Sequence, residues 1–211
     1  MMPSNLYVIA IAGPSCAGKS ELASRVALEL GGSVLLLDSY YRDLTSLAPA
    51  DRARVNFDDP CALDHELLID QVRALGLGRT VERPMYDFAT HTRIARTEPF
   101  AANDFLILEG LFALYWTELR ELAGTKVFVN APDDVCLTRR QRRDVAERGR
   151  TPESVVKQFT ETVQPMAAQY VRPTSKDADL VLSGEQPLRL SLNAVLEHVT
   201  QNATWGVVLA S

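Results

Sequence analysis

Short apolar runs alternate along this chain with longer stretches in which apolar residues recur at helical spacing. The apolar runs have the length of buried strands, and they cover residues 6–12, 33–37, 105–109, 126–130 and 179–183. The stretches with helical spacing cover residues 21–30, 64–75, 111–122, 132–148, 151–163 and 188–199. Strands that alternate with helices predict an α/β fold with a mainly parallel five-stranded sheet and helices on both faces.

The first apolar run leads directly into a glycine-containing segment that fits the pattern G-x-x-x-x-G-K-[ST]. The segment reads Gly13-Pro14-Ser15-Cys16-Ala17-Gly18-Lys19-Ser20. In such a loop, backbone N–H groups surround phosphate oxygens, and the next helix directs its positive dipole end at them. Lys19 is expected to reach the β- and γ-phosphates, and the Ser20 hydroxyl is expected to ligate Mg²⁺. A plain glycine-rich turn is the alternative, and the strand–loop–helix setting disfavours it.

Two further apolar runs end in acidic residues, Asp38 and Glu109. In an open parallel sheet, functional side chains gather at the carboxyl ends of the strands, beside the phosphate loop. Asp38 could accept a proton from a substrate hydroxyl or bind Mg²⁺, or it could simply cap a turn. Glu109 is expected to belong to the Mg²⁺ shell rather than merely to leave its strand.

Six arginines lie within twelve residues of an otherwise acidic protein. Three readings stay open for them: a solvated helix face paired with acidic neighbours, a lid that closes on phosphoryl groups, or a nucleic-acid-binding helix. The last is the least favoured, because aromatic residues are not interleaved and the rest of the chain is not basic. The six are Arg139, Arg140, Arg142, Arg143, Arg148 and Arg150.

Composition narrows the class of protein further. A net charge of −5 over 211 residues disfavours a general nucleic-acid binder. No apolar run approaches the ~20 residues that span a membrane, and no signal peptide is apparent at the N-terminus, so no membrane partner is expected. Three cysteines without C-x-x-C spacing suit a reducing cytosol and argue against a zinc site. His91, in an expected hairpin over residues 83–97, is by itself more typical of a surface histidine than of a metal ligand.

Taken together, these motifs make the chain resemble the uridine kinase (uridine–cytidine kinase) family over nearly its whole length. Order and spacing both agree. The matching pieces are Gly13 to Ser20, Asp38 to Tyr41, Asn56-Phe57-Asp58, Tyr86-Asp87-Phe88 with His91 and Arg93, Glu109-Gly110, Arg143-Asp144 with Glu147 to Arg150, Gln158, and Ala178-Asp179.

The resemblance implies a phosphate-loop kinase fold in one domain, 1–211, with a lid at about 139–158 and an acceptor-binding insertion at about 56–97. It implies transfer from ATP (or GTP), with Mg²⁺, to the 5′-hydroxyl of a pyrimidine nucleoside, and it allows a homo-oligomer. Asp38 looks like the general base, Ser20, Glu109 and Asp38 like the metal shell, and Arg140, Arg143 and Arg148 like phosphate-clamping lid residues. Asp58 looks like the carboxylate that holds the ribose hydroxyls, and the other residues near the nucleoside are then Arg150, Gln158, Tyr86 and His91.

Two departures from the family pattern and two alternatives remain. Asp59-Pro60 stands where the family commonly has His-Pro, and this places an extra negative charge near the expected ribose site. Residues 184–187 depart from the usual turn on the adenine side. A related kinase of another small hydroxyl substrate, such as phosphoribulokinase or pantothenate kinase, is one alternative, but Tyr86 and His91 disfavour it. The other is a nucleotide-gated switch without catalysis, which would have no need of Asp38 as a base.

Overall fold

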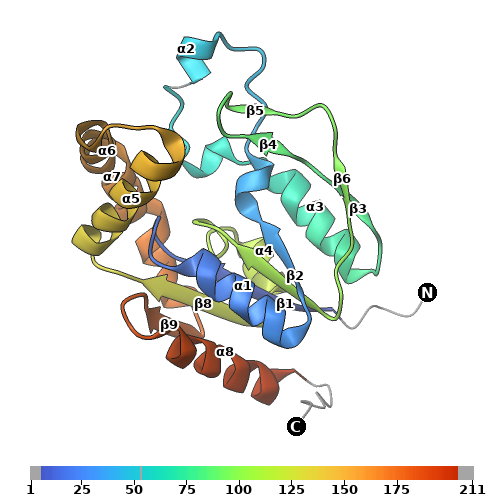
Figure 1. Ribbon diagram of the computed structural model, residues 1–211. Helices are drawn as coiled ribbons and strands as arrows, with labels where there is room; N and C mark the ends of the chain where they lie inside the picture. The colour runs from blue at the N-terminus through green and yellow to red at the C-terminus, as the bar shows by residue number, and fades with distance from the viewer. Residues whose placement is uncertain (1–5, 53, 204–211) are drawn as a thin grey trace.

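The predicted parallel α/β fold is confirmed by the computed structural model, which describes residues 6–52 and 54–203. The ends of the expected domain, residues 1–5 and 204–211, lie outside the described residues. Five parallel strands form the central sheet in the order β2-β7-β1-β8-β9 (Figure 1). Their bounds are β1 (Tyr7–Ala12), β2 (Ser33–Leu36), β7 (Phe105–Glu109), β8 (Thr125–Asn130) and β9 (Leu180–Ser183).

Alternate residues of the central strand enter two different cores. Val8, Ala10 and Ala12 of β1 belong to one cluster of buried residues, whereas Ile9 and Ile11 belong to the other. Successive side chains of a strand point to opposite faces, so a strand covered on both faces must be apolar throughout. This requirement explains why the strands read as unbroken apolar runs in the sequence.

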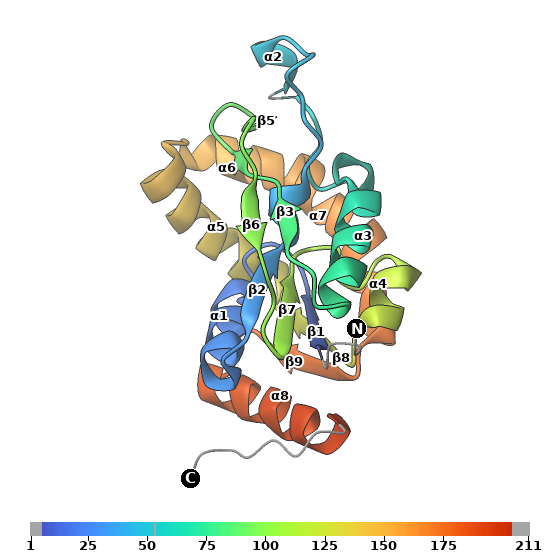
Figure 2. The same ribbon diagram turned by 90° about the vertical axis from the view of Figure 1, so that its right-hand side faces the viewer.

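Helices cover both faces of the sheet, as Figure 2 shows. On one face α1 packs against α8, and on the other α3 packs against α4. Gly31 ends α1 in the left-handed conformation (φ 61°), and the Asp64 side chain caps α3 by accepting a hydrogen bond from the Leu67 backbone N–H. The bounds are α1 (Lys19–Leu30), α3 (His65–Gly76), α4 (Thr117–Leu122) and α8 (Leu188–Asn202).

A helical region follows β8 and stands above the carboxyl edge of the sheet (Figures 1 and 2). Its second helix begins as predicted, with Thr151 as cap and Pro152 in the first turn. Pro165 interrupts the regular helix, which adopts π-helical turns on either side of it, because proline has no N–H for the helical hydrogen bond. The elements are α5 (Asp133–Arg148), α6 (Pro152–Gln158), η3 (Phe159–Val163), α7 (Gln164–Met166), η4 (Ala167–Val171) and η5 (Arg172–Asp177).

The segment between β2 and β7 holds several small elements outside the main sheet. The predicted hairpin is confirmed: β4 pairs with β5 in antiparallel fashion, and β3 pairs with β6 beside it. The elements are η1 (Leu37–Tyr40), α2 (Pro49–Arg52), η2 (Pro60–Ala62), β3 (Val81–Arg83), β4 (Tyr86–Asp87), β5 (Thr92–Arg93) and β6 (Glu98–Phe100). Among the described residues, no helix has the length and apolar character needed to cross a bilayer.

Three predicted boundaries were wrong. The helix expected from residue 111 begins only at Thr117, because residues 112, 113 and 114 are all buried and one face of a helix cannot bury three consecutive residues. The strand expected to reach Leu37 ends at Leu36, so Asp38 lies in the 3₁₀ turn η1. Pro132 caps α5 rather than occupying its first turn.

Candidate active site

The phosphate-loop pattern lies between β1 and α1, where the sequence predicted it. Gly13 has φ 142°, and a Cβ atom there would lie 2.1 Å from the Val129 carbonyl oxygen, so β8 requires glycine at this position. Gly18 caps α1 with φ 110°, a region that favours glycine. The buried Lys19 side chain turns back over the loop, and its Nζ donates to the Pro14 carbonyl oxygen at 2.9 Å. The loop is therefore fixed by backbone geometry that the two glycines permit.

Asp38 and Glu109 lie next to this loop at the carboxyl edge of the sheet. Burial raises the pKa of Glu109, while the Lys19 ammonium and a hydrogen bond from Ser20 act in the opposite direction. Asp38 remains open to the cavity, yet the protein around it raises its pKa by desolvation. Lys19, Arg148 and Arg143 oppose that shift. The site thus brings two carboxylates close to three cationic side chains, those of Lys19, Arg143 and Arg148.

Ser20, Glu109 and Asp38 all line the cavity and carry oxygen atoms, the ligand type that a magnesium ion takes. Mg²⁺ prefers oxygen ligands and usually keeps several waters, taking only one or two carboxylates from the protein together with substrate phosphates. In the part of the chain that the structure describes, no group of three or more His, Cys, Asp or Glu side chains could hold a metal ion. This donor set suits a metal that arrives with a nucleotide rather than one held by the protein alone.

Aromatic side chains line the side of the site that lies away from the phosphate loop. The Phe57 ring packs 5.2 Å from Tyr41 and stacks on His91 at 4.8 Å between centroids, with planes 19° apart. Burial lowers the pKa of His91, so its imidazole is neutral at neutral pH and has one donor and one acceptor nitrogen. The Tyr86 hydroxyl is buried with no hydrogen-bond partner among the described residues. A planar polar ligand in the cavity could bond to the His91 imidazole and pack against the Tyr86 ring, since both residues line the cavity.

Asp58 lies between these aromatic rings and the helical region. Burial raises its pKa, and the nearby Arg140 guanidinium is the largest opposing influence. Gln158 Oε1 accepts hydrogen bonds from Arg140 (3.2 Å) and from Arg150. Asp59 points elsewhere: its carboxylate accepts from the Cys61 backbone N–H at 2.8 Å and caps η2. The extra negative charge at residue 59 therefore serves to cap η2.

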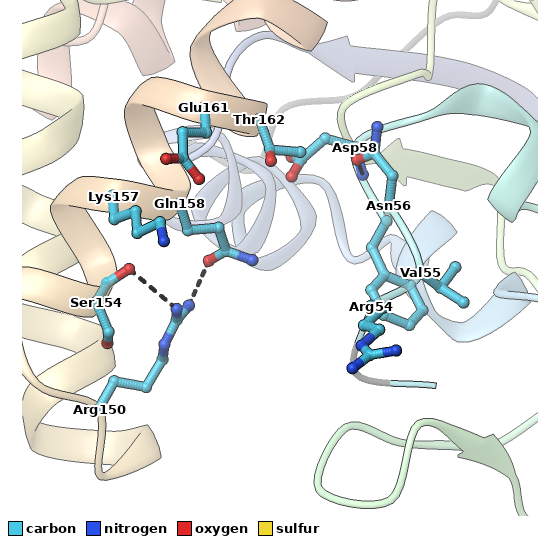
Figure 3. A pocket seen from close by; sticks show the side chains of 11 residues that line it. Arg54, Val55, Asn56, Asp58, Arg150, Ser154, Lys157, Gln158, Glu161 and Thr162 are labelled. Carbon is cyan, nitrogen blue, oxygen red and sulfur yellow. Dashed lines mark hydrogen bonds between the residues drawn. The ribbon is translucent and has the colours of Figure 1, made fainter. Parts of the chain in front are cut away.

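One cavity of about 1440 Å³ joins the phosphate loop to the aromatic side. The predicted site residues all line it except Gly13 and Pro14, the first two residues of the loop, which are buried. A second cavity of about 330 Å³ opens beside it, and Figure 3 shows Arg150 and Gln158 facing Asn56 and Asp58 across it. The predicted residues that line the large cavity are Ser15, Cys16, Ala17, Gly18, Lys19, Ser20, Asp38, Asp58, Tyr86, His91, Glu109, Arg140, Arg143, Arg148, Arg150 and Gln158.

Two arginines hold the site together through contacts that the sequence did not predict: one belongs to the six clustered arginines, and the other to the matched hairpin segment. Arg139 donates to the carbonyl oxygens of Cys16, Ala17 and Gly184, and so ties α5 to the loop and to the turn after β9. Arg93 donates to the Tyr41 and Tyr40 carbonyl oxygens and pairs with Asp64 at 3.1 Å. Both arginines donate hydrogen bonds to backbone oxygens far away in the chain, and no sequence pattern predicts such contacts.

Two aromatic residues of the cavity, Tyr41 and Phe57, were also missed as site residues. Both sit inside segments that the sequence had already singled out, next to Tyr40 and Asp58. The Tyr41 hydroxyl donates to the Phe57 carbonyl oxygen at 3.1 Å, and it also lowers the pKa of Asp38. Their aromatic character next to predicted polar ligand contacts was the available signal.

The parallel sheet, the glycine loop before α1 and the carboxylates at neighbouring strand ends define a phosphate-loop kinase fold. Solved structures agree on this fold. A candidate fructose transport system kinase from Silicibacter sp. TM1040 matches with a TM-score of 0.63 at 20% identity, over 86% of this chain and 90% of that one. A possible uridine kinase from Bacillus stearothermophilus matches with a TM-score of 0.52 at 21% identity, over 86% and 91%.

The chain belongs to the phosphoribulokinase / uridine kinase family, whose model matches residues 8–187. Its relatives include a uridine kinase of Aeromonas hydrophila subsp. hydrophila, 42% identical over 91% of this chain and 93% of that protein. A uridine kinase of Vibrio cholerae serotype O1 is 38% identical over 92% and 94%.

Proposed function

We propose that this protein transfers the γ-phosphoryl group of ATP to the 5′-hydroxyl of a pyrimidine nucleoside such as uridine or cytidine. The observation that carries the proposal is the single cavity, which has a phosphate-binding loop at one end, an aromatic and imidazole cluster at the other, and Asp38 between them. Relatives named uridine kinase over more than nine-tenths of the chain support the same assignment.

The donor nucleotide binds along the loop, with its phosphates against backbone N–H groups and Lys19. Its base then lies toward residues 183–191, where Gln186 donates to the Ser191 hydroxyl at 2.7 Å and both line the cavity. Arg143 and Arg148 face the transferring group from α5, where their positive charge offsets the negative charge of the transition state. When bound at Ser20, Glu109 and Asp38, Mg²⁺ would neutralise phosphate charge.

The acceptor nucleoside occupies the aromatic end. Its base contacts Tyr86 and His91, and its ribose hydroxyls contact Asp58 with Arg150 and Gln158 nearby. Asp38 then accepts the proton of the 5′-hydroxyl as the phosphoryl group transfers. Holding both substrates in one cavity supplies the orientation on which phosphoryl transfer depends.

An anionic sugar phosphate is a poorer fit for this acceptor end. Asp58 and Asp38 both contribute negative charge there: Asp38 raises the pKa of the Asp58 and Glu109 carboxyl groups, and both aspartates raise the pKa of Tyr41. A doubly charged acceptor would add repulsion, whereas a neutral nucleoside does not. The aromatic rings would also have no base to contact.

The lid at about 139–158 and the acceptor-binding insertion at about 56–97 are part of the proposal. All three cysteines are unpaired, which accords with the reducing cytosol that we propose as its location.

The test is a coupled assay of ADP release, in which pyrimidine nucleosides, purine nucleosides, ribulose 5-phosphate and pantothenate are offered as acceptors. The proposal expects turnover with uridine or cytidine that exceeds the rate without acceptor by orders of magnitude. Turnover only with a sugar phosphate or with pantothenate would show that this compound, rather than a pyrimidine nucleoside, is the acceptor. ATP binding without any acceptor-dependent ADP release would favour the nucleotide-gated switch.

A further inference from the structure

Four arginines of the helical region converge on a single carboxylate, that of Asp144 in α5. The Asp144 side chain has no solvent-exposed area. Because a buried carboxylate is costly unless it is paired, its surroundings are under strong constraint. The four contacts are Arg140 Nε at 3.4 Å, Arg143 Nη2 at 2.8 Å, Arg148 Nη1 at 3.6 Å and Arg150 Nη1 at 3.8 Å.

The two oxygens of Asp144 divide these arginines into pairs. Oδ1 contacts Arg143 and Arg148, and it accepts a hydrogen bond from Arg143 Nε at 2.8 Å. Oδ2 contacts Arg140 and Arg150 at ion-pair distances, without a hydrogen bond of good geometry from the described residues. Oδ1 therefore holds Arg143 by hydrogen bonding, whereas the other three arginines are held by charge at longer distances.

One arginine of each pair serves one part of the cavity, and the other reaches both parts. Arg148 acts electrostatically on Asp38 beside the phosphate loop, and Arg143 acts on both Asp38 and Asp58. Arg150 donates to Gln158 on the acceptor side, and Arg140 donates both to Gln158 and to the Ser15 hydroxyl of the phosphate loop at 3.0 Å. Figure 3 shows Arg150 bonded to Gln158 and Ser154 on the side of the small cavity that faces Asp58. Arg148 on Oδ1 thus belongs to the transfer site and Arg150 on Oδ2 to the acceptor site, while Arg143 and Arg140 connect the two.

We propose that Asp144 is a positioning residue that sets the arginines of both half-sites from one buried carboxylate, with Arg148 on Oδ1 serving phosphoryl transfer and Arg150 on Oδ2 serving acceptor binding. The inference rests on the phosphotransferase function proposed above. Asp144 does not touch substrate; it acts through the four guanidinium groups. One negative charge among four positive ones leaves excess positive charge for the phosphates while limiting repulsion among the arginines.

The first experiment compares Asp144→Asn with Asp134→Asn, which removes the same charge from the exposed side of α5. An asparagine keeps the shape but loses the charge, and its NH₂ group repels the guanidinium groups on one side. We expect kcat to fall on the order of 100-fold and the KM for the nucleoside to rise on the order of tenfold, since each tenfold step corresponds to one lost charge-assisted contact. Asp134→Asn should leave both within about twofold.

Double-mutant cycles separate positioning from a general structural role. Arg148→Gln should lower kcat, and Arg150→Gln should raise the KM for the nucleoside. If Asp144 acts through these residues, adding Asp144→Asn to Arg148→Gln should cost far less in kcat than it does alone, and adding it to Arg150→Gln should cost far less in KM. Strictly additive effects in both cycles would overturn the proposal.

The fold of each variant is checked by circular dichroism and thermal unfolding. If Asp144→Asn does not fold, the two single arginine variants still test the division, because Arg148 and Arg150 are at least partly exposed. Equal effects of both variants on kcat and on nucleoside KM would then contradict it. Absence of turnover in the unaltered protein would remove the proposed function instead, whereas turnover with additive cycles would remove only the role of Asp144.

Discussion

The donor and acceptor ends of the cavity are built in different ways. The donor end comes from one contiguous loop, Gly13 to Ser20, of which Ser15 to Ser20 line the cavity and whose backbone conformation creates the binding surface. The acceptor end is assembled from four segments far apart in the chain, residues 38–41, 57–58, 86–91 and 150–158, whose side chains create the surface. A site made from backbone depends on glycines at two positions, whereas a site made from side chains depends on every element that carries one.

The arginines that connect each end of the cavity to the rest of the fold also differ in what they do. Arg139 binds carbonyl oxygens of the donor loop, and Arg93 binds carbonyl oxygens of the turn that carries Asp38. Arg139 therefore secures a surface that already exists, while Arg93 brings the β4–β5 hairpin and η1 together so that the acceptor surface can form. Substitutions of side chains at the acceptor end should accordingly have larger effects on catalysis than substitution of a loop residue, such as Cys16, that contributes mainly its backbone.

The largest effect is expected at Asp38, where the two ends meet. Asp38→Asn keeps the shape of the side chain but removes the proton acceptor, so kcat should fall by about 10²–10⁴-fold. ATP binding, measured by calorimetry, should stay within about threefold of the unaltered protein. Turnover near the original rate would show that Asp38 is not the base.

Removal of the His91 ring tests the acceptor end alone. His91→Ala removes the polar group from the aromatic cluster, and the KM for the nucleoside should rise on the order of tenfold because one hydrogen bond and one ring contact are lost. The KM for ATP should hardly change in the same steady-state measurements. Arg96→Ala, an exposed position near the same hairpin, is the control. Equal changes in both KM values would refute base recognition by His91.

The pH dependence of kcat/KM should report the environment of Asp38. Asp38 must be ionised to accept a proton, and burial raises its pKa above the ordinary value of 3.8, so activity should rise with pH through a limb that lies above that value. Arg148 lowers this pKa, so Arg148→Gln should move the limb to higher pH. Arg189→Gln on α8, where the side chain is exposed, is the matched control. A limb that stays in place in Arg148→Gln would contradict the electrostatic coupling.

The raised pKa of Asp38 also predicts that replacing this carboxylate, which lowers activity, makes the folded protein more stable at neutral pH. Folded Asp38 binds its proton more tightly than in the unfolded chain, so the folded state loses stability as pH rises from the ordinary carboxyl range through the raised pKa. Asp38→Asn removes that penalty, so Tm at neutral pH should rise, and the gain should shrink as the pH is lowered through the raised pKa. A variant less stable than the unaltered protein at neutral pH would show that ionised Asp38 is not strained.

The smallest effect is expected within the donor loop. Cys16 adopts φ 65°, which a glycine adopts freely, and its carbonyl oxygen rather than its thiol binds Arg139. Cys16→Gly should change the KM for ATP by less than about threefold, because the backbone forms the surface. A much larger change would mean that the Cys16 side chain contributes to the donor end.

The donor end could be predicted from the sequence because its pattern is contiguous and its flanking strand and helix are strongly periodic. The five strands could be predicted for the same reason, since burial on both faces makes each an unbroken apolar run. Asp38 and Glu109 could be placed because parallel strands end at a common edge. The start of α4 could not, because residues 112–114 are buried consecutively through tertiary packing.

The long-range contacts that assemble the acceptor end could not be predicted from the sequence. The stacking of His91 on Phe57 joins residues 34 positions apart, and the contacts of Arg93 with Tyr40 and Tyr41 join residues more than fifty apart. The sequence predicts that the charge of Asp59 lies near the ribose site, whereas the structure shows its carboxylate accepting a hydrogen bond from the Cys61 N–H. Sequence proximity thus indicated neighbours correctly in the loop and misleadingly at residue 59.

The measurement that tests the central proposal most directly is phosphorus NMR of the product formed from ATP, Mg²⁺ and uridine. Donor and acceptor ends that meet at Asp38 predict one uridine 5′-monophosphate for each ADP, with no free phosphate in excess. Free phosphate without a phosphorylated nucleoside, or phosphate on a ribose hydroxyl other than the 5′ position, would contradict the proposed arrangement of the two ends.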